Sequence, residues 1–179
     1  VLVLLALGWA TISLSRGRYF HNDPAFIAQW IRTNPDSVDA LVNHAKYALD
    51  RGEHETARRS AERALRLAPE LPNAHYNFGL ANYHLGTLET VIAAYRRTLE
   101  LDPDYNAHYN LALALADSGA LPESLFHYRK ALEKNPRHVD ALYNLGLLLA
   151  RTEDYEGALP LFQKAAALDP TDPESVYNL

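Results

Sequence analysis

The sequence contains no cysteine, which excludes disulfides, thiolate metal ligands, thioether haem attachment and cysteine nucleophiles. It also contains no methionine, even at position 1, and it stops at Asn178-Leu179, where the pattern described below predicts the middle of a helix. We therefore expect the sequence to be a piece of a longer protein. The sequence also has no excess of basic residues, because it contains 17 Lys and Arg and 22 Asp and Glu, which gives a net charge of −5. Nucleic-acid-binding domains normally carry a basic footprint, so we expect no nucleic-acid partner.

The first fourteen residues, from Val1 to Leu14, carry no charge and are almost wholly apolar. A membrane-spanning helix needs roughly 20 such residues, and the segment lacks the positive start and small-residue cleavage site of a signal peptide. We interpret residues 1–15 as the C-terminal part of a transmembrane helix that begins upstream, with residues 1–18 in contact with membrane lipid. The alternative is a soluble helix packed on the first repeat. The first interpretation predicts a membrane-associated protein, and which side of the membrane the rest occupies stays open.

The most informative feature of the sequence is an internal repeat. Prolines that follow an apolar run recur at intervals of 34, 34, 33 and 34 residues. These prolines are Pro35, Pro69, Pro103, Pro136 and Pro170. A second marker recurs in the same register, as Asn-Ala-His-Tyr-Asn at 73–77 and 106–110 and as Asp-Ala-Leu-Tyr-Asn at 140–144. Two independent markers with one period indicate a tandem array of a single structural unit.

On these residues the sequence resembles the tetratricopeptide repeat family, whose unit is a 34-residue helix–turn–helix. The resemblance implies an all-α solenoid, a right-handed superhelix of antiparallel helix pairs. It also implies that residues 16–37 hold a connector and one half-repeat helix, at 23–34, and that residues 38–179 form the array. The units of the array are 38–71, 72–104, 105–138, 139–172 and a partial unit at 173–179.

The family's packing positions match residue by residue; the first helix of a unit is called helix A and the second helix B. The small residue of helix A is Ala45, Gly79, Ala112 and Gly146. The small residue of helix B is Ala57, Ser124 and Ala158, with the larger Val91 in the second unit. The aromatic residue of helix B is Tyr95, Tyr128 and Phe162, with Ala61 in the first unit. The glycine of the turn between the helices is Gly52, Gly86 and Gly119, with Glu153 in the last unit. Small residues let two helices approach and aromatic residues fill the space between units, so this pattern predicts packing between neighbouring units.

In this family the A helices line a concave groove, and two columns of residues are expected to face it. One column is Asn43, Asn77, Asn110, Asn144 and Asn178. The other is Tyr76, Tyr109, Tyr143 and Tyr177, with Val42 in the first unit. Each asparagine offers a donor and an acceptor that could pair with the backbone of an extended peptide, and tyrosine supplies contact area at low entropic cost. The alternative is that both columns serve packing between the helices.

Basic residues are sparse on the predicted groove, where only Lys46 and Arg151 stand near the two columns. A carboxylate clamp of the kind that holds a chaperone's C-terminus needs several lysines and arginines, so we expect none here. The eight histidines do not form an H-E-x-x-H motif, and the sequence has no G-x-S-x-G, P-loop or G-x-G-x-x-G motif. The triplet Asp102-Pro103-Asp104 falls in a turn between units, where Asp and Pro are common. We therefore expect no metal, no cofactor and no catalysis within these residues.

Three functional hypotheses remain open from the sequence. The first is a membrane-anchored interaction scaffold that recruits a partner protein or an extended peptide through the groove. The second is the C-terminal repeat region of a polytopic membrane glycosyltransferase, whose catalysis would lie upstream of Val1. The third is a permanent structural or assembly subunit of a membrane complex.

Overall fold

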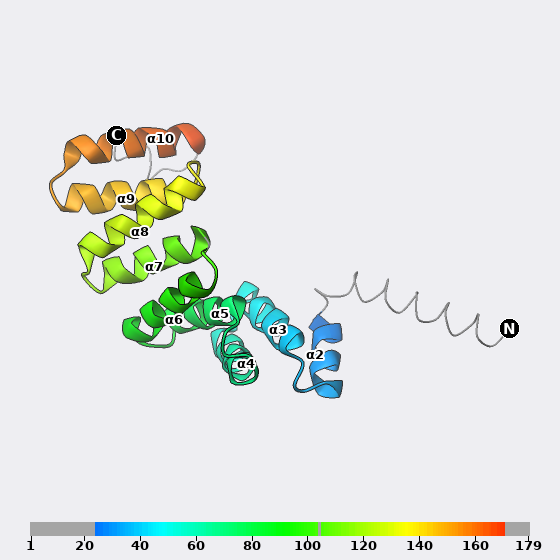
Figure 1. The fold of residues 1–179 in the computed structure, drawn as a ribbon. Helices are drawn as coiled ribbons and strands as arrows, with labels where there is room; N and C mark the ends of the chain where they lie inside the picture. The colour runs from blue at the N-terminus through cyan, green and yellow to red at the C-terminus, as the bar shows by residue number, and fades with distance from the viewer. Residues whose placement is uncertain (1–23, 104, 171–179) are drawn as a thin grey trace. The chain divides into compact units, whose positions relative to one another are not determined.

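The computed structural model describes residues 24–103 and 105–170, and in these ranges all regular structure is α-helical (Figure 1). The helices are α2 (Pro24–Thr33), α3 (Val38–Asp50), α4 (His54–Leu67), α5 (Pro72–Tyr83), α6 (Leu88–Leu101), α7 (Tyr105–Asp117), α8 (Leu121–Lys134), α9 (Val139–Arg151) and α10 (Tyr155–Leu168). The prediction of an all-α solenoid of helix pairs is confirmed. The apolar residues 1–15 and the partial unit 173–179 lie outside the described residues. None of the helices in the described ranges is long and apolar enough to cross a membrane.

The chain divides into two compact units, and the division falls within α5, between Ala81 and Asn82. In the first unit, α2 packs against α3 and α3 against α4. In the second unit, α6 packs against α7, α7 against α8, α8 against α9, and α9 against α10. Within each unit, the helices named here therefore pack on their sequence neighbours, as expected for an array of short repeats.

Helix starts and turns use local side-chain chemistry. The Ser37 hydroxyl accepts a hydrogen bond from the Ala40 backbone N–H at the start of α3, and an Asp154 carboxylate oxygen accepts one from the Gly157 N–H at the start of α10. The turns that join α3 to α4 and α7 to α8 each contain a glycine with positive φ, Gly52 at +71° and Gly119 at +83°. Glu153 takes this conformation at φ 64° in the last unit, where its side chain makes the conformation less favourable than glycine would.

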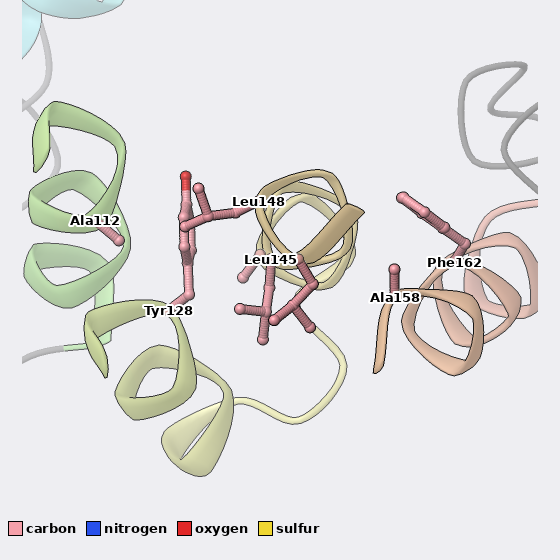
Figure 2. Close-up of a cluster of buried hydrophobic side chains, with 8 residues drawn as sticks. Ala112, Tyr128, Leu145, Leu148, Ala158 and Phe162 are labelled. Carbon is pink, nitrogen blue, oxygen red and sulfur yellow. The ribbon is translucent and has the colours of Figure 1, made fainter. Parts of the chain in front are cut away.

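The largest core cluster lies in the second unit and combines small residues with two aromatic rings (Figure 2). Its buried members are Ala112, Tyr128, Ala141, Leu145, Leu148, Leu149, Ala158 and Phe162. Tyr128 stands between α7 and α9, with Ala112 on one side and Leu145 and Leu148 on the other (Figure 2). The positions that the repeat pattern assigns to packing are therefore buried, including the departing Val91 at 0% exposed.

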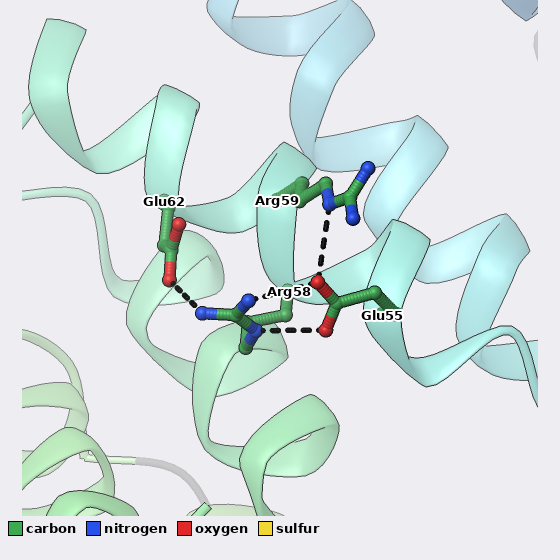
Figure 3. Close-up of polar contacts among 4 residues, drawn as sticks. All are labelled: Glu55, Arg58, Arg59 and Glu62. Atoms are coloured by element: carbon green, nitrogen blue, oxygen red, sulfur yellow. Dashed lines mark hydrogen bonds and ion pairs between the residues drawn. The ribbon is translucent and has the colours of Figure 1, made fainter. Parts of the chain in front are cut away.

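Helix α4 of the first unit is more polar than the corresponding helices of the second. Arg58 donates to Glu55 and Glu62 at 2.8 and 2.7 Å, and Arg59 donates to Glu55 at 3.1 Å (Figure 3). Arg58 occupies the register position that holds Leu125 in α8, which packs on the large cluster. These ion pairs are solvent-exposed or nearly so, and such pairs contribute little to stability.

Candidate partner-binding face

The structure places the described members of the predicted groove on four A helices, two in each unit. Asn43 and Lys46 belong to α3, and Tyr76 and Asn77 to α5, within the first unit. The second unit carries Tyr109 and Asn110 on α7 and Tyr143, Asn144 and Arg151 on α9. Tyr177 and Asn178 lie outside the described residues.

Two asparagines use their side-chain amides to link consecutive A helices. Asn77 is only 6% exposed, and its Nδ2 donates to the Val42 carbonyl at 3.2 Å. Asn144 Nδ2 donates to the Tyr109 hydroxyl, also at 3.2 Å. In each case the acceptor belongs to the residue 35 positions earlier, so the repeat brings the same register of the preceding A helix within reach. This geometry supports the packing role of the column, and contact of its members with a ligand stays a prediction.

The tyrosines of the second unit are half-buried and contribute to the contacts between helices. The Tyr109 ring lies 4.6 Å from the His138 ring and 6.1 Å from the Tyr128 ring, measured between centroids. Burial raises the pKa of the Tyr109 hydroxyl, and the nearby Asp140 carboxylate adds to the rise. The Tyr143 ring lies 5.7 Å from Phe162. The Tyr109 hydroxyl therefore stays neutral at physiological pH and can act as a hydrogen-bond donor or acceptor.

An apolar residue that the sequence analysis did not single out lies beside these side chains. Leu147 is 38% exposed although it belongs to a helix whose other leucines are buried. It follows Tyr143 by four residues and precedes Arg151 by four, so the three side chains share one stripe of α9. Asn144, three residues before Leu147, borders the same stripe. We call Tyr143, Asn144, Leu147 and Arg151 the α9 face. The spacing of four residues from Tyr143 to Leu147 and from Leu147 to Arg151 is the sequence signal that could have revealed Leu147.

The α9 face combines an aromatic ring, an amide, an aliphatic side chain and one exposed cation. Such a surface can bury an apolar side chain of a partner against Leu147 while Tyr143 supplies a hydroxyl, which is a common composition for protein recognition. Lys46, the other predicted basic residue, is exposed on α3 in the first unit. Within residues 24–103 and 105–170, no group of three or more His, Asp or Glu side chains could hold a metal ion.

Comparison with known proteins decides the family. One family model described as tetratricopeptide repeat matches residues 42–104 and 127–173, and a second with the same description matches residues 105–138. The chain belongs to the tetratricopeptide repeat family. The helix pairs, the buried small residues and the positive-φ turns described above are the physical basis of this membership.

Individual relatives of this tetratricopeptide repeat chain match different shares of it. The Protein CTR9 homolog of Arabidopsis thaliana is 38% identical over 73 residues, which are 40% of this chain and 7% of that protein. This chain therefore spans a small part of the length of that relative.

Two solved structures share the fold over larger parts of the chain. YrrB, described as a tetratricopeptide repeat protein with an unusual peptide-binding site, is 25% identical with a TM-score of 0.73, over 92% of this chain and 85% of that one. A mutant of the O-GlcNAc transferase of Thermobaculum terrenum is 28% identical with a TM-score of 0.68, over 73% of this chain and 26% of that one.

Proposed function

We propose that this chain is a protein–protein interaction module that binds an extended segment of a partner protein on its A helices and catalyses no reaction itself. The observation that carries the proposal is the exposed Leu147, flanked by Tyr143 and Arg151 on a helix whose other leucines pack inside. The peptide-binding site named for YrrB, which shares the fold at 25% identity, supports the same reading.

The chemistry of the α9 face specifies the kind of segment that it would bind. Leu147 and Tyr143 favour an aliphatic or aromatic side chain, because its burial removes apolar area from water at about 25 cal/mol per Å². Arg151 is a single exposed cation and can meet one carboxylate at the edge of the site. We therefore infer a partner segment with an apolar anchor and one acidic neighbour, in contrast to a terminal carboxylate held by several lysines.

Replacing Leu147 by Glu is expected to weaken binding of such a segment at least about tenfold, because an apolar contact worth roughly 1.4 kcal/mol is replaced by a charge. The measurement starts with selection of short random peptides displayed on phage against the purified chain. Affinities of a selected synthetic peptide for the parent chain and the variant are then compared by isothermal titration calorimetry, with circular dichroism as the check of folding.

The matched control is Phe126→Glu on α8, which places the same charge at another exposed apolar position, 53% exposed, on a B helix. We expect this control to bind the selected peptide with unchanged affinity. Equal weakening in both variants, or weakening in Phe126→Glu alone, would locate binding away from the α9 face and contradict the proposal. The α9 substitution tests binding more cleanly than replacement of Asn77 by Ala, because Asn77 also holds α5 to α3.

We further propose that residues 1–18 tether the module to a membrane, on the basis of the uncharged apolar run at 1–14. Deleting residues 1–18 is expected to move the chain from the membrane pellet to the supernatant after ultracentrifugation of cell lysate, because the apolar segment is removed from the lipid. A carbonate wash separates an inserted segment from a peripheral one. Continued sedimentation of the deleted chain with membranes would show that this segment is not the tether.

A second candidate function is the repeat region of a glycosyltransferase. The observation in its favour is the structural match to an O-GlcNAc transferase. The match covers 26% of the transferase chain. In that case the repeats would bind the acceptor protein and a separate catalytic domain would lie elsewhere on the same polypeptide. The intact mass of the native protein distinguishes the two candidates, because only the second requires a catalytic domain in the same chain.

A further inference from the structure

Two histidines meet across the helix pair α7/α8 of the second unit. His108 Nδ1 on α7 lies 2.9 Å from His127 Nδ1 on α8, and the two ring planes are inclined by 32° with centroids 5.1 Å apart. The His127 side chain is only 12% exposed. The same helix pair is held one turn away by the Ser124 hydroxyl, which donates to the Ala112 carbonyl at 2.7 Å.

The short distance between the two Nδ1 atoms restricts the protons that the pair can hold. A neutral imidazole carries one N–H and one lone pair, so one Nδ1–H can donate to the other Nδ1. A second proton on the accepting nitrogen would place two N–H groups against each other and remove the hydrogen bond. The contact therefore needs one of the two Nδ1 atoms to stay unprotonated: a proton taken up at Nε2 of the donating ring leaves the hydrogen bond in place, whereas protonation of both rings converts the contact into repulsion.

The charged groups around His127 do not compensate for the charge of a doubly protonated pair. Glu123 on α8 approaches His127 Nε2 at 3.9 Å and favours the cation. Its two carboxylate oxygens, however, already accept hydrogen bonds from Arg96 of α6 at 2.7 and 2.9 Å, and the Arg96 charge opposes a second cation nearby. Burial, with a further contribution from His108 on α7, lowers the pKa of His127 to about 4.

The first unit contains a related contact that lacks this restriction. His44 Nδ1 on α3 lies 2.8 Å from the Ser60 hydroxyl on α4, and Ser60 occupies the register position of His127. A hydroxyl can donate to a neutral imidazole or accept from a protonated one. The α3/α4 contact therefore tolerates a charged histidine, although burial also lowers the pKa of His44.

We propose that the His108–His127 pair is an acid-sensitive latch, which holds α7 against α8 at neutral pH and releases them when both histidines are protonated. A histidine exposed by opening regains its ordinary pKa near 6.5 and binds the proton that the closed pair excludes. The closed state is therefore fully favoured above pH 6.5 and loses stability as the pH falls from 6.5 towards 4, by up to about tenfold in the opening equilibrium for each pH unit.

Hydrogen–deuterium exchange of the whole chain at pH 7.4 and pH 5.0, corrected for the intrinsic exchange rates, tests the latch. The protection of α7 and α8 amides is expected to fall by up to about 30-fold at pH 5.0, since the change crosses about 1.5 pH units below 6.5. The protection of α3 and α4 is expected to change less. Equal loss in the two helix pairs, or no loss in α7 and α8, would overturn the proposal.

The matched variants are His127→Gln, which removes the titrating ring, and His84→Gln, which removes an exposed histidine of the same unit. The pH dependence of α7 and α8 protection is expected to disappear in the first and persist in the second. If His127→Gln does not fold, imidazole ¹⁵N spectra of the unaltered chain decide the question. Titration of both His108 and His127 with ordinary pKa values near 6.5 would overturn the latch, and retention of one shared proton below pH 6 would support it.

Discussion

Replacing Tyr128 by Ala is expected to lower the free energy of unfolding by about 3–5 kcal/mol, the largest effect of any single substitution proposed for this chain. The Tyr128 ring is 2% exposed and lies between Ala112 of α7 and Leu145 and Leu148 of α9 (Figure 2). Its removal leaves a cavity that alanine cannot fill and that the flanking helices can close only by moving together. Urea unfolding followed by circular dichroism measures the change.

Two controls separate this cavity from other effects of the substitution. Tyr128→Phe keeps the volume of the ring and is expected to cost less than about 1.5 kcal/mol. Tyr155→Ala removes the same side chain from a position that is 66% exposed and is expected to change stability by no more than about 0.5 kcal/mol. A Tyr128→Ala variant as stable as Tyr155→Ala would show that α7, α8 and α9 are not held together by this ring.

Adding a single methyl group at Gly146 is expected to destabilise the second unit by about 1–3 kcal/mol. A Cβ at this position would lie 2.7 Å from Cε1 of Phe162, a ring that is 4% exposed and has Tyr143 on another side. Alanine has a higher helix propensity than glycine by about 1 kcal/mol, so propensity alone predicts the opposite sign. Thermal and urea unfolding of Gly146→Ala therefore report directly on how closely α9 and α10 pack.

A double-mutant cycle assigns the effect to the ring. Phe162→Leu leaves space for the added methyl group, so the two substitutions together are expected to cost less than the sum of the two singles by roughly 1 kcal/mol. Ala112 shows that a Cβ is tolerated at the corresponding position of α7, where the cluster is arranged around Tyr128. Stabilisation by Gly146→Ala would contradict the close approach of α9 and α10.

The repeat period predicts the backbone of this chain well, because small and aromatic residues at fixed spacing leave few ways to pack a helix pair. Val91 and Ala61 break the family pattern and yet are both buried at 0% exposed, since the neighbouring helices determine which positions face inward. The period does not predict the partner of an individual side chain. His75 and His108 stand at equivalent positions, but His75 Nε2 pairs with the Pro69 carbonyl at 2.8 Å and His108 pairs with His127.

For the predicted binding residues too, the sequence identifies the position of a residue in the repeat but not the contact that its side chain makes. The sequence identifies the asparagine column, but the burial of Asn77 and its hydrogen bond to the Val42 carbonyl depend on how α5 packs on α3, which the repeat pattern does not specify. Leu147 was overlooked because an apolar residue in an amphipathic helix is ordinarily assigned to the core. Its exposure of 38% follows from the packing of α9 between α8 and α10, which only the three-dimensional structure specifies.

The separation between the buried packing positions and the outward residues Leu147 and Arg151 has a consequence for how such a chain can diversify. Ser124 and Ala158 on the B helices and Ala141 on α9 are at most 3% exposed, so exchanges there are constrained by volume. Leu147 and Arg151 project from α9 without contributing to the large buried cluster. Two of the residues proposed for recognition therefore differ from the packing residues of the same helix. A library that randomises only these outward positions is expected to retain the scaffold while a new ligand preference is selected.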